Sequence, residues 1–118
     1  MTAFNKTPRP LHSIWGQVDE AKEIMNGMWR VHTPSHGGII LSPERLDHVP
    51  LALQYASFNR QGMQGFFEED CDMAIPLATF FTEYRQYLRA VRCATEERIE
   101  EIMKTVNQAV DRIYEKSI

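Results

Sequence analysis

Two series of apolar residues in the C-terminal half constrain the fold of this chain more than any other feature. Each series follows a 4-3-4-3 spacing, which places its members along one stripe of an α-helix. The first series is Leu77, Phe81, Tyr84, Leu88 and Val91, and the second is Ile99, Met103, Val106, Val110 and Ile113. The pattern predicts two long amphipathic helices, with Thr95 as the N-cap of the second. A single bent helix over residues 76–116 is the alternative.

The N-terminal third carries strand signals instead. Asn26-Gly27 lies between two apolar pairs, and this dipeptide suits a two-residue hairpin turn. After a turn-forming segment over residues 34–38, the apolar run Ile39-Ile40-Leu41 is typical of a further strand. We therefore expect a small three-stranded antiparallel sheet over about residues 13–42. The charged run over residues 19–23 has helix propensity, which favours a turn ahead of the hairpin.

The segment after the predicted sheet begins with a helix start signal. Ser42 supplies a capping oxygen, Pro43 suits the first helical position, and Glu44 suits the positive end of a helix. Short helices are expected from Pro43 onward. The fold class is therefore α+β, with a flexible arm over residues 1–12 and a single domain over residues 13–118.

Composition and charge argue against several classes of protein. No apolar run approaches the ~20 residues that cross a bilayer, and the first residues contain no apolar signal segment. We therefore expect a cytoplasmic protein without a membrane partner. Cys71 and Cys93 fit neither a disulfide framework nor a zinc site, so no metal and no cofactor are expected. The net charge of −3 argues against direct binding of nucleic acid.

Acidic residues gather in the second half of the chain. Residues 61–118 hold eleven Asp and Glu against seven Lys and Arg, whereas residues 1–60 hold five against six. We interpret two clusters as candidate binding surfaces: Glu68, Glu69, Asp70 and Asp72, and Glu96, Glu97, Glu100 and Glu101. The first cluster also suits the first turn of a helix. The second can pair internally with a nearby stripe of arginines on one helical face: Arg85, Arg89 and Arg92.

One pair of residues suggests catalysis. Cys71 and His36 resemble a nucleophile and its base, as in a small hydrolase or transferase. The acids around Cys71 disfavour its thiolate, and two glycines after His36 are explained by a tight turn that needs positive φ angles. A buried cysteine and a structural turn are the preferred interpretation, and the Cys/His-dependent enzyme is the alternative.

Several motifs occur in an order that resembles a known family. They are Trp15-Gly16, the run over residues 27–33, a His-Gly-Gly turn at residues 36–38, Ser-Pro-Glu-Arg at residues 42–45 and Glu-Glu-Asp-Cys at residues 68–71. Over about residues 13–82 the chain resembles an uncharacterised domain family of proteobacteria that is frequent on plasmids, phages and integrated elements. The resemblance implies a shared fold and an origin in a mobile element.

The leading hypothesis is a non-enzymatic interaction protein, because the sequence contains no complete catalytic set. With a mobile-element origin, we expect a counter-defence factor of the anti-CRISPR type that binds an unidentified host protein complex through an acidic or a helical surface. The apolar stripe Ile99, Met103, Val106, Val110 and Ile113 suits either the core or a contact with a partner helix, such as a homodimer. A dimeric DNA-binding regulator that uses the arginine stripe is a weaker alternative.

Overall fold

The computed structural model describes residues 3–70 and 72–117. Within them, a four-stranded antiparallel sheet has the strand order β3-β4-β5-β6, and a two-stranded hairpin precedes it. The strands are β1 (His12–Ser13), β2 (Gly16–Gln17), β3 (Glu20–Met25), β4 (Met28–His32), β5 (Gly37–Leu41) and β6 (Phe66–Glu68). The helices are α1 (Pro43–Leu46), α2 (Leu51–Ala56), the 3₁₀-helix η1 (Phe58–Gln64), α3 (Ala74–Thr79), α4 (Phe81–Ala90) and α5 (Glu96–Ser117). The α+β class is confirmed.

The sheet has one strand more than the sequence predicted. β6 pairs with β5, and its adjacent residues Phe66 and Phe67 point to opposite faces of the sheet. Phe67 is fully buried in the main core, whereas Phe66 packs edge-on against Trp15. The expectation of one three-stranded sheet over residues 13–42 is wrong: the start of this range forms the separate β1–β2 hairpin, and the main sheet comprises β3, β4, β5 and β6. The pairing of β5 with β6 joins segments so far apart that it leaves no local signal in the sequence.

The charged run over residues 19–23 also differs from the expectation. Most of it belongs to the edge strand β3, which pairs along β4. Cross-strand pairing outweighs the helix propensity of these residues. The hairpin turn at Asn26-Gly27 is confirmed, with left-handed backbone at Gly27 (φ 82°). A Cβ atom on Gly27 would lie 2.7 Å from Ser42 Oγ, so this position favours glycine on steric grounds as well.

The helix start at Ser42 is confirmed. Ser42 Oγ accepts a hydrogen bond of 3.2 Å from the backbone N–H of Arg45, and Pro43 is the first residue of α1. This cap places the short helix α1 directly after β5. A second short helix, α2, begins directly after Pro50, which ends the preceding segment.

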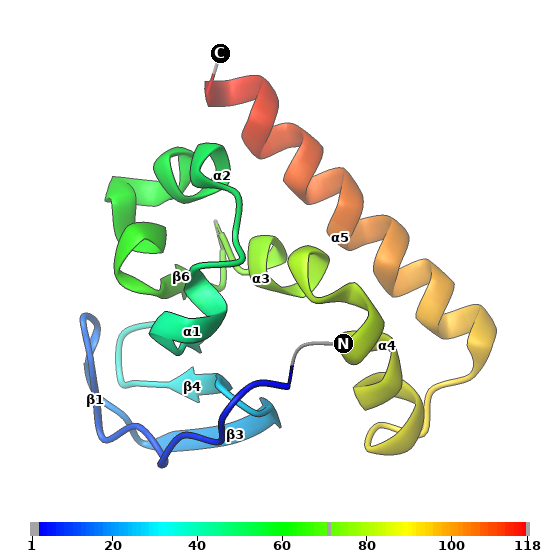
Figure 1. Cartoon of the computed structure of the whole chain (residues 1–118), viewed down its shortest axis with the longest axis horizontal. Coiled ribbons are helices and arrows are strands. Elements are labelled where there is room, and N and C mark those ends of the chain that lie inside the picture. Colours follow the sequence, from blue (N-terminus) through cyan, green and yellow to red (C-terminus); the bar gives the residue numbers. More distant parts are fainter. Residues whose placement is uncertain (1–2, 71, 118) are drawn as a thin grey trace.

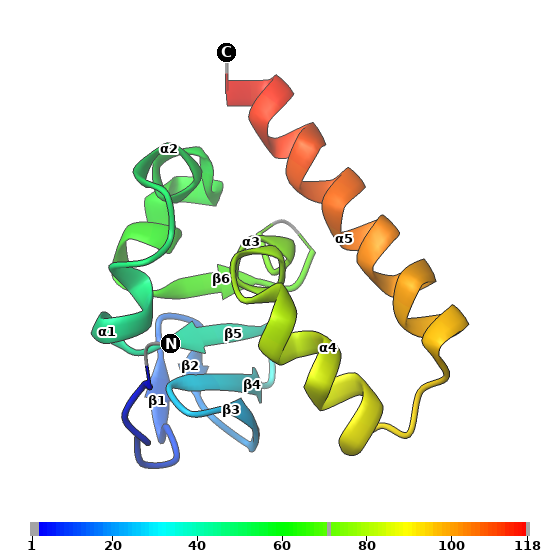
Figure 2. The same cartoon turned by 45° about the vertical axis from the view of Figure 1, so that its right-hand side comes forward.

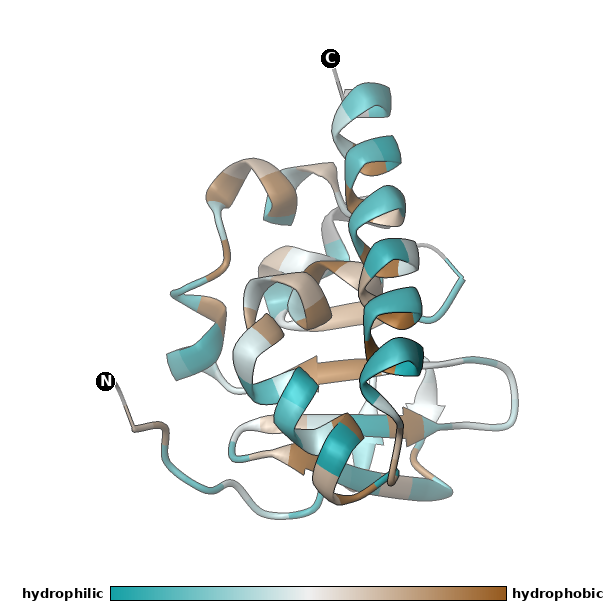
Figure 3. Cartoon of the chain, turned by 90° about the vertical axis from the view of Figure 1, so that its right-hand side faces the viewer, coloured by the Kyte–Doolittle hydropathy of each residue, from teal (hydrophilic) through white to brown (hydrophobic). Residues whose placement is uncertain are grey.

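The helices build two layers beside the sheet (Figures 1 and 2). In both views α3 lies between the sheet and α5, while α4 and α2 lie to either side of it. Side chains of the sheet (Met28, Ile39), of α3 (Ile75) and of α5 (Ile99) are fully buried in one core. Figure 3 shows that the apolar stripe of α5 faces this core and that its hydrophilic face is turned outward.

One of the two long helices is confirmed and the other is not. α5 spans its predicted range, and Thr95 caps it by accepting a hydrogen bond of 3.1 Å from the N–H of Arg98. The first series is split between α3 and α4 at Phe80 (φ −107°, ψ 45°). Phe80 turns into the core, and Phe81 and Val91 are left exposed. Because residues 91–95 are not helical, the single bent helix is also wrong.

Residues 3–11, which we expected to belong to a flexible arm, lie against the domain. The ring of Phe4 packs edge-on against Phe80, with 5.6 Å between the ring centroids. Trp29 Nε1 donates a hydrogen bond of 3.0 Å to Thr7 Oγ1. These contacts join the segment to the α3–α4 junction and to the sheet. Among the helices of the described residues, none combines the length and the apolar character that crossing a membrane requires.

Candidate functional site

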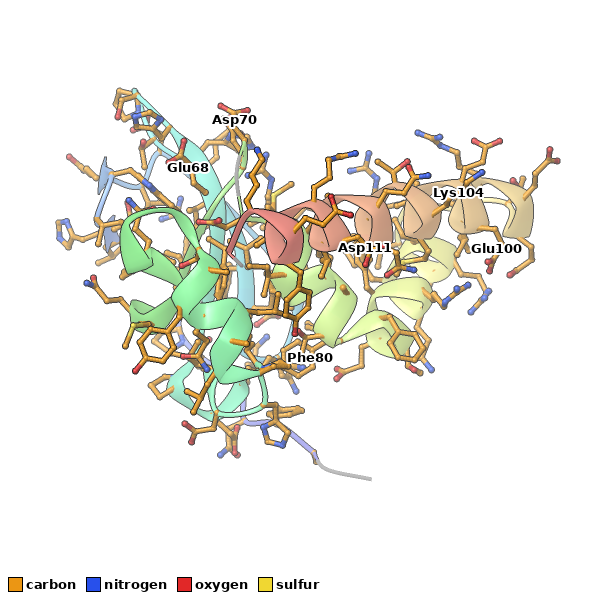
Figure 4. The ribbon with its side chains drawn as sticks, turned by 90° about the horizontal axis from the view of Figure 1, so that it is seen from above. Glu68, Asp70, Phe80, Glu100, Lys104 and Asp111 are labelled. Carbon is orange, nitrogen blue, oxygen red and sulfur yellow. The ribbon has the colours of Figure 1, made fainter. Side chains whose placement is uncertain are left out.

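The first acidic cluster follows a strand instead of opening a helix. Glu68 is the last residue of β6, and α3 begins at Ala74, so the interpretation as a first helical turn is wrong. Asp72 is buried, with 2% of its surface exposed, whereas Asp70 is exposed and points outward (Figure 4). The cluster therefore spans the inside and the outside of the molecule and does not form one acidic surface.

The second acidic cluster lies on α5 and is largely paired with arginines. Hydrogen bonds from these arginines lower the pKa of Glu96 and of Glu100 below the ordinary range. Within residues 3–70 and 72–117, Glu97 is the member of the cluster without an ion pair. The internal pairing considered above is therefore present, and it occupies two arginines of the predicted stripe. The three pairs are Arg85–Glu100, Arg89–Glu96 and Arg98–Glu101.

The apolar stripe of α5 belongs to the core of this chain. Ile99, Met103, Val106 and Val110 are buried, and Ile113 is half-buried against the same core. In this conformation a partner helix has no access to the buried residues. The stripe therefore has a structural role, whatever the oligomeric state.

The proposed catalytic pair has no described geometry, because Cys71 lies outside the described residues. His36 Nδ1 lies 3.7 Å from Glu68 Oε1, beyond hydrogen-bond distance. Gly37 and Gly38 belong to β5 and have no positive φ angle, which corrects the reason we gave for these glycines. A Cβ atom on Gly38 would lie 2.5 Å from Trp15 Cη2, so this glycine permits close packing against the indole.

Helix α2 exposes apolar side chains and buries its polar one. Leu51 and Tyr55 lie one turn apart and have 67% and 56% of their surface exposed, and Ala52 beside them is exposed as well. Gln54 is buried, and its Nε2 donates a hydrogen bond of 2.8 Å to the carbonyl oxygen of Val49. Leu53 of the same helix is buried in the core, so α2 carries apolar side chains on its outer side as well as on its inner side, whereas the outer side of a surface helix is normally polar. We call Leu51, Ala52 and Tyr55 the α2 face.

A groove of about 550 Å³ runs between the edge strand β3 and the end of α4. Its lining brings together four cationic side chains and two carboxylates, which come from the N-terminal segment, the strands β3 and β4 with the residue before β3, and the α4–α5 connection. We call it the cationic groove. It is lined by Arg9, Asp19, Glu20, Ala21, Lys22, Arg30, His32 and Arg92.

Strand register brings the central cations of this groove together. Lys22 is opposite Arg30 across β3 and β4, so both side chains lie on one face of the sheet. Arg30 Nη2 donates a hydrogen bond of 2.9 Å to Glu69 Oε2, which fixes the guanidinium. This hydrogen bond is the main cause that lowers the pKa of Glu69, and His32 adds to it. The ammonium of Lys22 lies 5.9 Å from the ring centroid of Tyr87.

A second pocket, of about 420 Å³, shares Arg92 with the groove. The rings of Tyr84 and Tyr87 are nearly parallel, at 14°, with 6.2 Å between their centroids. Burial raises the pKa of Tyr84, and the neighbouring Tyr87 raises it further, so the Tyr84 hydroxyl keeps its proton. We call this cavity the tyrosine pocket. It is lined by Tyr84, Tyr87, Leu88, Arg92, Ala94, Arg98 and Ile102.

The two cavities suit an anion, because cations outnumber carboxylates at their junction. The backbone N–H of Arg92 donates a hydrogen bond to the carbonyl oxygen of Tyr87, but its guanidinium makes no ion pair or hydrogen bond with the other described residues and is available. Among the described residues no cluster of three His, Cys, Asp or Glu side chains suits a metal ion. The sequence pointed to Arg92 through the arginine stripe. It did not point to Lys22 and Arg30, since their adjacency depends on strand register.

Comparison with known proteins gives one match. The profile of a family described as Domain of unknown function (DUF7007) matches residues 8–117. None of the curated proteins and none of the solved structures matches the chain. The α2 face, the cationic groove and the tyrosine pocket all lie within the matched residues.

Proposed function

The chain belongs to the DUF7007 family, whose description assigns no activity, and from its own residues we propose that it is a non-enzymatic protein-interaction protein. It binds a partner protein through the α2 face. The sequence predicted a helical surface on the stripe of α5, which is part of the core, and it did not predict the α2 face.

The exposed apolar face of α2 is the observation that carries this proposal. Leu51 and Tyr55 face water, while Leu53 is buried in the core and Gln54 is buried with its amide hydrogen-bonded. An exposed apolar patch marks an interaction site more often than a random feature of the surface. Covering this patch releases about 25 cal/mol for each Å² of apolar surface removed from water. Met63, in the following helix η1, is a further exposed apolar residue.

The acidic form of the surface has less support. Asp70 and Glu97 are the members of the two clusters that are both exposed and outside the ion pairs of the described residues. Exposed ion pairs contribute little stability, but they still neutralise the field that would attract a basic partner. An apolar contact is therefore the stronger candidate.

The biological setting we propose is a mobile element, with a host defence complex as the partner, as for an anti-CRISPR inhibitor. The support is the resemblance of the motifs over about residues 13–82. Several of these motifs build the scaffold here: Ser42 caps α1, and Gly38 packs against Trp15. The α2 face lies outside the quoted motifs, so a partner contact there is separate from the scaffold.

The first experiment is an affinity pull-down from a lysate of a host that carries its defence systems, with mass spectrometry of the retained proteins. The wild-type chain should retain a stoichiometric protein complex, and the double variant Leu51→Asp/Tyr55→Asp should lose it. Phe81→Asp is the matched control, because Phe81 is similarly exposed (52%) but lies on α4. Retention of the same complex by the double variant, with a native circular-dichroism spectrum, would exclude the α2 face. Loss of the complex in the Glu97→Lys variant would instead favour binding through the acidic surface.

The counter-defence setting has a separate test. In a host with active CRISPR interference, expression of the wild-type chain should restore plating of a targeted phage, and the α2-face double variant should not. Unchanged interference in the presence of the wild-type chain removes the anti-CRISPR role, while a partner found by pull-down would still support the interaction.

A further inference from the structure

The cationic groove and the tyrosine pocket share one lining residue. Arg92 lines both cavities, which have volumes of about 550 Å³ and 420 Å³. These volumes lie in the range of pockets that hold small molecules, ~300–1,000 Å³. The two cavities also differ in character, since one is lined by charged side chains and the other by aromatic and aliphatic ones. A ligand that bridges them must therefore have a charged part and a planar apolar part.

The charged part must be an anion. Arg9, Lys22, Arg30 and Arg92 face the groove against Asp19 and Glu20, in a chain whose net charge is −3. Arg30 is held in place by Glu69, whose carboxylate offsets part of its charge, and a guanidinium with a fixed orientation suits the oxygens of a phosphate. Arg9, Lys22 and Arg92 are the lining cations outside the ion pairs of the described residues.

The planar part fits the tyrosine pocket. The parallel rings of Tyr84 and Tyr87 form an aromatic wall, and Leu88 and Ile102 contribute aliphatic surface. Nucleobases stack on such side chains without regard to base identity, because every base has a π-face. Arg98 adds a second guanidinium to the lining of this pocket.

We propose that the two cavities together form a binding site for a nucleoside monophosphate, with the phosphate beside Arg92 and Arg30 and the base against the Tyr84–Tyr87 wall. The ligand is a small phosphate ester and not a nucleic-acid polymer. A polymer needs an extended cationic track to release its counterions, whereas Asp19, Glu20 and the acidic start of α5 border this site.

This site is independent of the proposed partner contact. β3 and α4, which border the groove, lie at the opposite end of the molecule from α2 in both views (Figures 1 and 2). A variant of one site can therefore be assayed without disturbing the other, and failure of one proposal leaves the other standing.

Isothermal titration calorimetry tests the proposal with AMP, GMP, CMP and UMP, with inorganic phosphate, and with the nucleosides alone. At least one nucleotide should bind saturably, and at least tenfold more tightly than phosphate or its own nucleoside. Arg92→Ala should reduce this affinity at least tenfold. Tyr87→Leu should reduce it to the level of phosphate, and Tyr87→Phe should retain it. Arg112→Ala is the control, since Arg112 is exposed on α5 and lines neither cavity.

Three outcomes would overturn the proposal. The first is no saturable binding of any nucleotide at millimolar concentration, and the second is equal binding by Arg92→Ala and Arg112→Ala. The third is equal affinity for phosphate and nucleotide, which would remove the base from the site. Each variant is first compared with the wild type by circular dichroism. Arg92 is exposed, so we expect Arg92→Ala to keep the native fold. If a tyrosine variant unfolds, Arg92→Ala alone still tests the proposal.

Discussion

At the scale of single residues, Arg45 joins segments that lie far apart in the sequence. It is 1% exposed, and its Nη1 and Nη2 atoms donate hydrogen bonds of 2.9 and 2.8 Å to the two carboxylate oxygens of Glu83. Its guanidinium lies 4.0 Å from the ring centroid of Phe4 and 4.6 Å from that of Phe80. Arg45 also donates to the carbonyl oxygen of Asn26. It therefore ties the N-terminal segment, the hairpin turn and the start of α4 to α1.

We expect Arg45→Ala to lower the free energy of unfolding by about 2 kcal/mol, because it removes a buried side chain together with its hydrogen bonds and ring contacts, while Glu83, which is 40% exposed, regains contact with water. Arg45→Lys should restore less than half of this loss, since an ammonium lacks the bidentate geometry and the stacking surface. Urea denaturation followed by circular dichroism measures both values. A loss below about 1 kcal/mol for Arg45→Ala would show that the contacts of this side chain are not stabilising.

Glu69 makes the stability depend on pH in a defined direction. Its pKa is below the ordinary value of 4.5, mainly because of the hydrogen bond from Arg30. A lowered carboxyl pKa contributes stability above the unfolded pKa, and this contribution is lost as the pH falls through the folded pKa. Glu69→Gln should therefore cost about 0.5–1 kcal/mol at pH 7, because the pair is partly exposed, and less at pH 3, where protonation of the carboxyl weakens the pair. Urea titrations at both pH values measure this difference.

A cost of Glu69→Gln that is the same at pH 3 and pH 7 would contradict the role of the Arg30–Glu69 pair. Glu97→Gln is the control, because Glu97 has no ion pair among the described residues and should show no such difference.

At the scale of elements, the sequence predicted the caps and the turn that depend on local signals. The Ser42 and Thr95 caps and the Asn26-Gly27 turn depend on neighbours within a few residues, and all three are present. The strand β6 and the break at Phe80 depend on distant partners, and the sequence missed both. The packing of Phe80 against Phe4 is one such long-range contact.

The sequence did not predict the cationic groove, because the pairing of β3 with β4 is irregular. A two-residue turn at Asn26-Gly27 without irregularity would place Lys22 opposite Val31. A register shift between Glu23 and Met25 places it opposite Arg30 instead. A shift of one residue exchanges the faces of the sheet, so the juxtaposition of these two cations could not be predicted from turn chemistry alone.

The Thr95 cap provides a test at the same scale. Thr95 Oγ1 accepts a hydrogen bond from the backbone N–H of Arg98 at the start of α5. This N–H would otherwise lack a partner within the helix. Thr95→Ala should lower the free energy of unfolding by about 1 kcal/mol. Thr105→Ala is the control, because Thr105 is exposed in the middle of the same helix and its hydroxyl donates to a carbonyl that already belongs to the helix. Equal effects of the two substitutions in thermal unfolding would contradict the capping role.

At the scale of the whole molecule, α3 links the sheet to α5. It lies between the two (Figure 2), and its buried residues belong to the same core as those of α5. Without α5, the side of α3 that packs against this helix would be exposed to water. The stripe of α5 therefore completes a core that the sheet and the short helices leave open.

Substitutions on α5 can distinguish whether its apolar stripe completes the core of one chain or forms a contact between two copies. Met103 is 2% exposed, so Met103→Asp buries a carboxylate without a partner in the core, a cost that exceeds ~5 kcal/mol and rivals the total stability of a domain of this size. We expect this variant to lose its cooperative thermal transition. Lys104→Asp, on the exposed face one residue away, should change the stability by less than about 0.5 kcal/mol. If light scattering instead shows a dimeric wild type and a folded, monomeric Met103→Asp variant, the stripe joins two copies of the chain and does not complete the core of one.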